Sequence, residues 1–192
     1  MKNKSLFPLF CFIIFNILII GCKKEENDAP QSVNAGPIYR IGQGYGGGTI
    51  FYVDATGNHG LVVDTSNTIP KKSWAGSADS FVATNAISTE MGTGANNSQT
   101  IITSVGAGNY AAYACEELVL NGFNDWFLPS KAELYFLYAQ KAEGLINNLN
   151  DDFYWSSSET SEDGAWSQSF ITGSSSSAHK SGFYAVCAVR AF

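Results

Sequence analysis

The sequence predicts one α+β domain, in which β-strands at both ends of the fold flank two central helices. Two short strand patterns joined by a turn come first, and two stretches with helical spacing of apolar residues follow. From Phe153 onward bulky residues alternate with small or polar ones, which is the two-residue period of a strand. The predicted order is therefore an N-terminal β-hairpin, two helices and a three-stranded antiparallel meander.

The hairpin consists of strands at Thr49–Asp54 and Leu61–Asp64, which a turn-forming stretch separates. The glycine-rich segment Gly42–Gly48 comes directly before the first strand. A phosphate-binding loop would lead into a helix that carries Lys-Ser or Lys-Thr. Because a strand follows instead, we do not expect this segment to bind phosphate.

Two helices are expected in the middle of the chain. The first covers Asn109–Leu120 and ends before Gly122, a residue type that commonly terminates helices. The second follows Ser130, which together with Glu133 has the spacing of a capping box, and it runs to about Ala142. Ser73–Gly108 is polar and dotted with glycine, so long ordered loops with at most one short helix are expected there.

The meander is expected to use three alternating segments, Tyr154–Glu159, Ala165–Phe170 and Phe183–Phe192. Between the last two lies Gly173–Gly182, which is rich in serine and contains Ala178 as its one apolar residue. We expect this stretch to be an exposed loop.

The first residues have the character of a secretory signal. Lys2 and Lys4 precede the apolar run Leu6–Ile20, which at 15 residues is shorter than the roughly 20 needed to span a bilayer. Ile19–Cys22 resembles a bacterial lipobox, in which the cysteine is acylated; the alternative is a plain secretory signal. We expect residues 1–21 to be a lipoprotein signal peptide, residues 22–37 a lipidated tether that begins at Cys22, and residues 38–192 the folded domain.

The charged tether, Lys23–Asp28, resembles the export tag of some surface lipoproteins. Two acyl chains anchor a protein stably, so we expect a tethered outer-membrane protein displayed at the cell surface, with the periplasmic face as the alternative. Without Lys2 and Lys4 the chain has 9 basic and 17 acidic residues, a net charge of −8. This balance argues against nucleic acid as a partner.

No enzymatic centre is evident in the sequence. His59 and His179 have no second metal-ligating residue at a suitable spacing, and no nucleophile motif is present. We therefore predict that the protein is not an enzyme and needs no metal or cofactor.

Several sequence motifs resemble a known family. They are N-G-F-N-D-W-F-L-P-S-K-A-E-L (Asn121–Leu134), Y-W-S-S-S-E (Tyr154–Glu159), A-W-S-Q-S-F (Ala165–Phe170) and A-V-R-A-F (Ala188–Phe192). Their order resembles the Lcl-type domain of a bacterial collagen-like adhesin over about residues 38–192. The resemblance implies a C-type-lectin-like fold with a binding role, adhesion or ligand recognition. The alternative is a structural envelope lipoprotein with no ligand site of its own.

The resemblance also implies roles for single residues. Lectin-like domains join the first helix to the last strand by a disulfide, which implies a Cys115–Cys187 bond. This chain has Cys187 where the family commonly has arginine, a one-residue departure that moves a side chain to the other strand face. Arg190 matches the family's terminal arginine, and an ion pair with Glu133 or Asp125 is expected.

The expected ligand surface combines Ser157–Asp163 with Ser174–His179, because binding residues concentrate in loops on a rigid scaffold. Trp166 is either a core residue or an aromatic anchor for the ligand. Calcium at Glu159, Glu162 and Asp163 is an alternative to a solvated acidic turn. The candidate ligand-binding residues are Ser157, Glu159, Asp163, Trp166, Ser175 and His179, and the ligand itself is not evident from the sequence.

Overall fold

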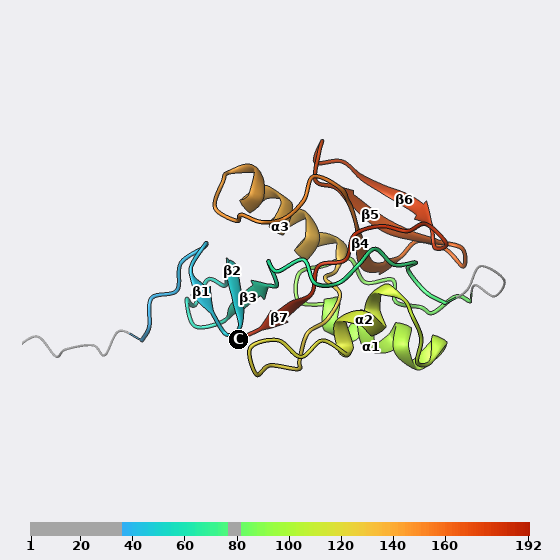
Figure 1. The fold of residues 1–192 in the computed structure, drawn as a ribbon, viewed down its shortest axis with the longest axis horizontal. Helices are drawn as coiled ribbons and strands as arrows, with labels where there is room; N and C mark the ends of the chain where they lie inside the picture. The colour runs from blue at the N-terminus through green and yellow to red at the C-terminus, as the bar shows by residue number, and fades with distance from the viewer. Residues whose placement is uncertain (1–35, 77–81) are drawn as a thin grey trace, which may run out of the picture. The chain divides into compact units, whose positions relative to one another are not determined.

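A computed structural model describes residues 36–76 and 82–192. The predicted signal peptide, Cys22 and nearly all of the predicted tether lie outside these residues. Within them the fold is α+β, with two antiparallel sheets and three helices (Figure 1). None of these helices is both long and apolar enough to cross a membrane.

The first sheet has the strand order β1-β2-β3-β7. Its strands are β1 (Gly44–Tyr45), β2 (Gly48–Val53), β3 (Gly60–Val63) and β7 (Val189–Ala191). The predicted hairpin is confirmed as β2 and β3, which pair antiparallel. The last strand pairs with β3, with Val63 opposite Val189 and Leu61 opposite Ala191. The sheet thus joins the beginning of the domain to its end.

The second sheet has the order β4-β5-β6. Its strands are β4 (Phe153–Glu159), β5 (Gly164–Ser169) and β6 (Ser175–His179). The prediction of a serine-rich loop is wrong, because Ser175–His179 is a regular strand. It pairs with β5 from Gly164 opposite His179 to Gln168 opposite Ser175. A strand at a sheet edge does not need two apolar faces, so the absence of bulky residues did not prevent pairing.

The prediction that the C-terminal strand completes the meander is also wrong. Residues 183–188 instead run between the two sheets, with single bridges from Tyr184 to Lys72 and from Ala185 to Tyr154. Val189 then enters the first sheet, where its side chain is fully buried. The alternating pattern there comes from a connecting segment that becomes buried from Val186 onward, and not from a third strand of the meander.

The helices agree only in part with the sequence. Helix α3 (Lys131–Ala142) is as predicted, and the capping box of Ser130 and Glu133 is present. Helix α2 (Ala111–Glu116) is shorter than expected: it ends at the C-cap Glu117, four residues before the turn at Asn121 and Gly122, both of which have positive φ. Helix α1 (Gly94–Val105) has 12 residues and lies where long loops with at most one short helix were expected. Its inward face includes the polar residues Asn97 and Ser98, so the helical apolar period is weak.

Two hydrophobic clusters form the core. One contains three tryptophans whose side chains are fully buried, Trp74, Trp126 and Trp155. The other gathers residues of both sheets and of α3.

The Arg190 guanidinium lies between β7 and the segment before α3, where Nε and Nη2 donate to Asp125 at 2.6 and 2.7 Å. This confirms one of the two expected partners, and Arg190 holds the pKa of Asp125 below its ordinary value.

The expected disulfide is not formed, because Cys115 and Cys187 are both free and buried. Cys115 packs in the cluster with the tryptophans, whereas Cys187 belongs to the other cluster. Burial raises the pKa of both thiols. Each cysteine therefore contributes as a small apolar side chain.

Replacement of Trp155 by alanine tests the packing of the larger cluster. The ring is fully buried, stacks on Tyr184 with centroids 4.5 Å apart, and donates from Nε1 to the Lys72 carbonyl at 3.0 Å. Trp155→Ala should lower the free energy of unfolding by about 3–5 kcal/mol, measured by chemical denaturation. Near-wild-type stability would show that the ring is not part of the core.

Candidate functional site

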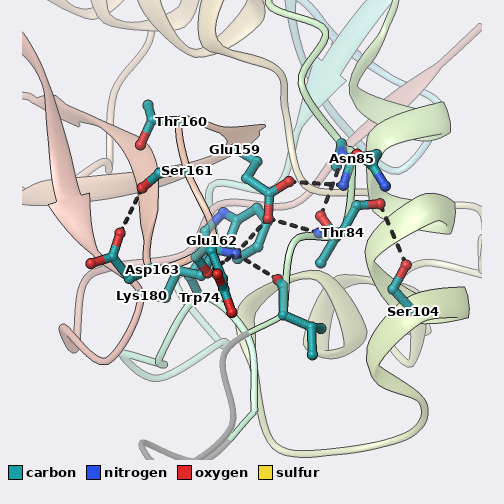
Figure 2. Close-up of polar contacts among 12 residues, drawn as sticks. Trp74, Thr84, Asn85, Ser104, Glu159, Thr160, Ser161, Glu162, Asp163 and Lys180 are labelled. Carbon is teal, nitrogen blue, oxygen red and sulfur yellow. Dashed lines mark hydrogen bonds and ion pairs between the residues drawn. The ribbon is translucent and has the colours of Figure 1, made fainter.

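The buried ion pair between Glu159 and Lys180 lies at one end of the second sheet (Figure 2). Glu159 is the last residue of β4, and Lys180 directly follows β6. Their side chains are 3% and 0% exposed, and Nζ lies 2.5 Å from Oε1. A buried pair of this kind needs further hydrogen bonds to compensate for the loss of water.

Backbone groups supply those hydrogen bonds. Glu159 accepts from the N–H groups of Thr84 at 2.9 Å and Asn85 at 2.8 Å. Lys180 Nζ donates to the carbonyls of Val82 at 3.0 Å and Glu162 at 2.6 Å, and it lies 4.7 Å from the Trp74 ring centroid. Both carboxylate oxygens of Glu159 are thereby engaged inside the protein, which gives this candidate residue a structural role.

The other acidic candidates do not converge with Glu159. Asp163 accepts a hydrogen bond from the Ser161 hydroxyl at 2.7 Å, which lowers the pKa of Asp163. In Figure 2 its carboxylate points toward Ser161 and away from Glu159. Across residues 36–76 and 82–192 no cluster of three or more His, Cys, Asp or Glu side chains could hold a metal ion.

Ser157 and His179 also lie apart from each other. Ser157 is fully buried in β4, and within the described chain its hydroxyl is the one buried side-chain polar atom without a hydrogen-bond partner. His179 is exposed at the end of β6, where its Nδ1 lies 2.7 Å from the Ser181 hydroxyl. The six candidate residues therefore do not form one surface.

Trp166 and Ser175 do lie beside a surface hollow. Ser175 and Lys131 both line it, and Lys131 Nζ lies 3.3 Å from the ring centroid of the half-buried Trp166. The hollow, which we call the Lys131 hollow, has a volume of about 290 Å³. It is lined by Thr89, Glu90, Lys131, Ala132, Tyr135 and Ser175.

The walls of the Lys131 hollow are fixed by the start of α3. The Ser130 hydroxyl donates to the Glu90 carbonyl at 2.7 Å, and the Ala132 N–H donates to the Thr89 carbonyl at 2.9 Å. The Lys131 N–H donates to the Ser158 hydroxyl at 3.0 Å, which ties the helix to β4. A helix, a strand and a hydrogen-bonded loop thus hold the lining residues in place.

The lining offers several kinds of contact to a ligand. Tyr135 is 54% exposed and presents an aromatic face. Lys131 supplies a cation, Glu90 a carboxylate, and Thr89 and Ser175 hydroxyl groups. Small-molecule and peptide sites combine such polar groups with apolar or aromatic surface. A hollow of larger volume, about 490 Å³, lies on α1. Its lining consists only of polar uncharged side chains of that helix, so it offers a ligand no aromatic or charged group.

Sequence reasoning missed most of the Lys131 hollow. Lys131 and Tyr135 are four residues apart on α3, so they lie on one helix face. That spacing was available from the sequence. The contribution of Thr89 and Glu90 was not, because it depends on how the loop before α1 meets the start of α3.

The described residues thus define an α+β domain with a surface hollow between a helix and a sheet edge. The family model of the Lcl C-terminal domain matches residues 73–190. The chain belongs to the Lcl C-terminal domain family. The matched region begins after the β2–β3 hairpin and ends within β7. Because β7 pairs with β3, the first sheet combines strands from outside the match with the end of the match. A search of curated proteins found no match.

Lys180→Met tests the buried ion pair. It leaves the Glu159 carboxylate buried without its cation, so the free energy of unfolding should fall by about 3–5 kcal/mol in chemical denaturation. Glu159→Gln in the same chain should recover part of the loss. Lys141→Met is the control, because its partner Asp151 is 71% exposed and surface pairs contribute about 0–1 kcal/mol. Equal effects of the two lysine variants would contradict a special role for Lys180.

Proposed function

We propose that the domain is a C-type-lectin-like binding module, held on the outer membrane by lipid at Cys22, and that the Lys131 hollow is its ligand site. The observation that carries the proposal is the convergence of Lys131, Tyr135 and Ser175 around one hollow beside Trp166. Family membership supports a binding role in adhesion or recognition at the cell surface.

The lectin-like assignment is supported by the order of the elements. A hairpin comes first, helices follow, and β7 returns to pair with the hairpin strand β3. The first described residues and the last strand therefore belong to the same end of the domain. The Lys131 hollow is built by α3, by the loop before α1 and by Ser175 of the second sheet.

Binding without catalysis is the proposed activity. The two cysteines among the described residues, Cys115 and Cys187, are buried, and burial raises the pKa of each thiol. A nucleophilic or redox cysteine needs exposure and a lowered pKa, so neither residue has the required character. The hollow itself contains one carboxylate and one ammonium group, which suit ligand recognition.

Variants of the hollow test the binding site. Lys131→Ala and Tyr135→Ala should each weaken ligand binding about tenfold, because charged and aromatic side chains commonly dominate small interfaces. The full chain, purified in detergent, would be applied to arrays of glycans and matrix proteins. Gln99→Ala on α1 is the matched control and should bind as the wild type does. Unchanged binding by both hollow variants with an intact melting temperature would instead favour the structural envelope role.

The anchor is tested by Cys22→Ser. Loss of the acylated cysteine should release the protein from the membrane fraction of fractionated cells. A variant that still requires detergent for extraction would refute the lipid anchor. Protease treatment of whole cells separates surface display from the periplasmic alternative, since only a displayed domain is accessible.

A further inference from the structure

Strand β6 is the open edge of the second sheet. The other edge, on β4, is covered, because three of its N–H groups donate to carbonyls of neighbouring segments. These bonds run from Trp155 to Ala185, from Ser157 to Pro129 and from Glu159 to Ala86. In Figure 1 β6 is drawn at the outer margin of the domain.

The register of β6 determines which backbone groups face outward. The Ser169 N–H donates to the Ser174 carbonyl at 2.9 Å, and the Lys180 N–H donates to the Asp163 carbonyl at 2.8 Å. In an antiparallel ladder hydrogen-bonded pairs alternate with pairs whose N–H and C=O groups point away from each other. Counting inward from both ends, Ser175 and Ser177 direct their backbone groups away from β5.

These outward groups have no hydrogen-bond partner within the part of the chain that the structure describes. Two N–H and two C=O groups, spaced two residues apart, therefore form a template for another strand. Natural sheets usually protect such an edge with lysine, proline or a bulge. The sequence of β6, S-S-S-A-H, has no lysine or proline, and its pairing with β5 shows no register shift.

The open edge borders the Lys131 hollow, because Ser175 belongs to both. We propose that the ligand of this site is an extended peptide segment of a partner protein, which adds to β6 as a further strand and places a side chain in the hollow. This proposal rests on the proposed function. Main-chain hydrogen bonds would give affinity and the hollow would select the side chain, as in other cases of strand addition.

The backbone pattern favours a peptide over other ligands. An extended peptide repeats donors and acceptors at the spacing that Ser175 and Ser177 present, whereas the hydroxyl groups of a glycan do not. A second copy of β6 would place serine against serine, since the strand carries only Ala178 as an apolar residue. A partner peptide, in contrast, can supply an aromatic or charged side chain to Lys131 and Tyr135.

Two variants of one residue separate backbone from side-chain recognition. Ser177→Pro removes an outward N–H that the β5–β6 ladder does not use, which an edge strand tolerates. Ser177→Ala keeps that N–H and removes the hydroxyl, which lies 2.6 Å from the Thr160 hydroxyl. The probe is a heptapeptide selected from a random phage-displayed library on the full chain in detergent, and its affinity is measured by fluorescence anisotropy.

Ser177→Pro should bind this peptide about tenfold more weakly, which corresponds to the loss of about one hydrogen bond, and Ser177→Ala should bind like the wild type. Methylation of single amide nitrogens of the peptide, tested on the wild-type chain, gives a readout that does not depend on folding of a variant. Affinity should fall at every second position of the paired stretch. An effect that does not alternate, or wild-type affinity of a folded Ser177→Pro variant, would overturn the proposal.

The remaining outcomes identify other ligands. Failure to select any peptide, or glycan binding that Ser177→Pro leaves unchanged, would overturn strand addition. Dimerisation that Ser177→Pro abolishes would make a second copy the occupant and would equally refute a partner peptide. If Lys131→Ala and Tyr135→Ala still weaken binding in those cases, the Lys131 hollow remains the ligand site and only the peptide assignment fails.

Discussion

The ion pair between Glu159 and Lys180 is the interaction on which the second sheet depends. Strand β6 has almost no apolar side chain, so the hydrophobic effect holds it only weakly. The residue that follows it, Lys180, is nevertheless fully buried and joins β4 through Glu159. The same two side chains bind the backbone at residues 82, 84, 85 and 162. A charged pair thereby does for this end of the sheet what apolar packing does elsewhere, and its hydrogen-bond partners keep the burial of charge from being prohibitively costly.

Glu133 has a related function at the start of α3. Its carboxylate accepts from the N–H groups of Ser130 at 2.8 Å, Gly92 at 2.8 Å and Gly94 at 3.3 Å. Burial raises the pKa of Glu133, and these hydrogen bonds oppose that shift because they favour the ionised form. A Cβ on Gly94 would lie 2.3 Å from a Glu133 oxygen, so only glycine allows this approach. Glu133 thus fixes the loop before α1 against α3, and the same loop provides Thr89 and Glu90 to the Lys131 hollow.

Local signals in the sequence predicted the local structure well. The β2–β3 hairpin and the capping box at Ser130 follow from turn chemistry and spacing. Features that depend on distant partners could not be predicted in the same way. Helix α1 buries Asn97, which donates to the Ser88 carbonyl, and Ser98, which donates to the distant Leu128 carbonyl, and these polar residues on its inward face hide its apolar period. Strand β6 likewise owes its place to Lys180, and a lysine after a serine run gives no sign of its burial. The candidate site had the same limit, since Trp166 was evident as a motif residue and Ser175 as part of the serine-rich stretch, while the loop beside them was not.

The two kinds of polar group in this domain have separate consequences. Inside, the charges of Glu159, Lys180 and Glu133 are satisfied by the protein itself, so they specify the arrangement of strands and loops and leave nothing for a ligand to bind. Outside, the backbone groups of Ser175 and Ser177 and the side chains around Lys131 lie on elements that those internal contacts hold rigid. Rigid presentation reduces the conformational entropy lost on binding, which would favour binding at the proposed site. The serine composition of β6 then has a physical reason: small side chains leave the strand edge accessible, and the buried Lys180 supplies the stability that they cannot.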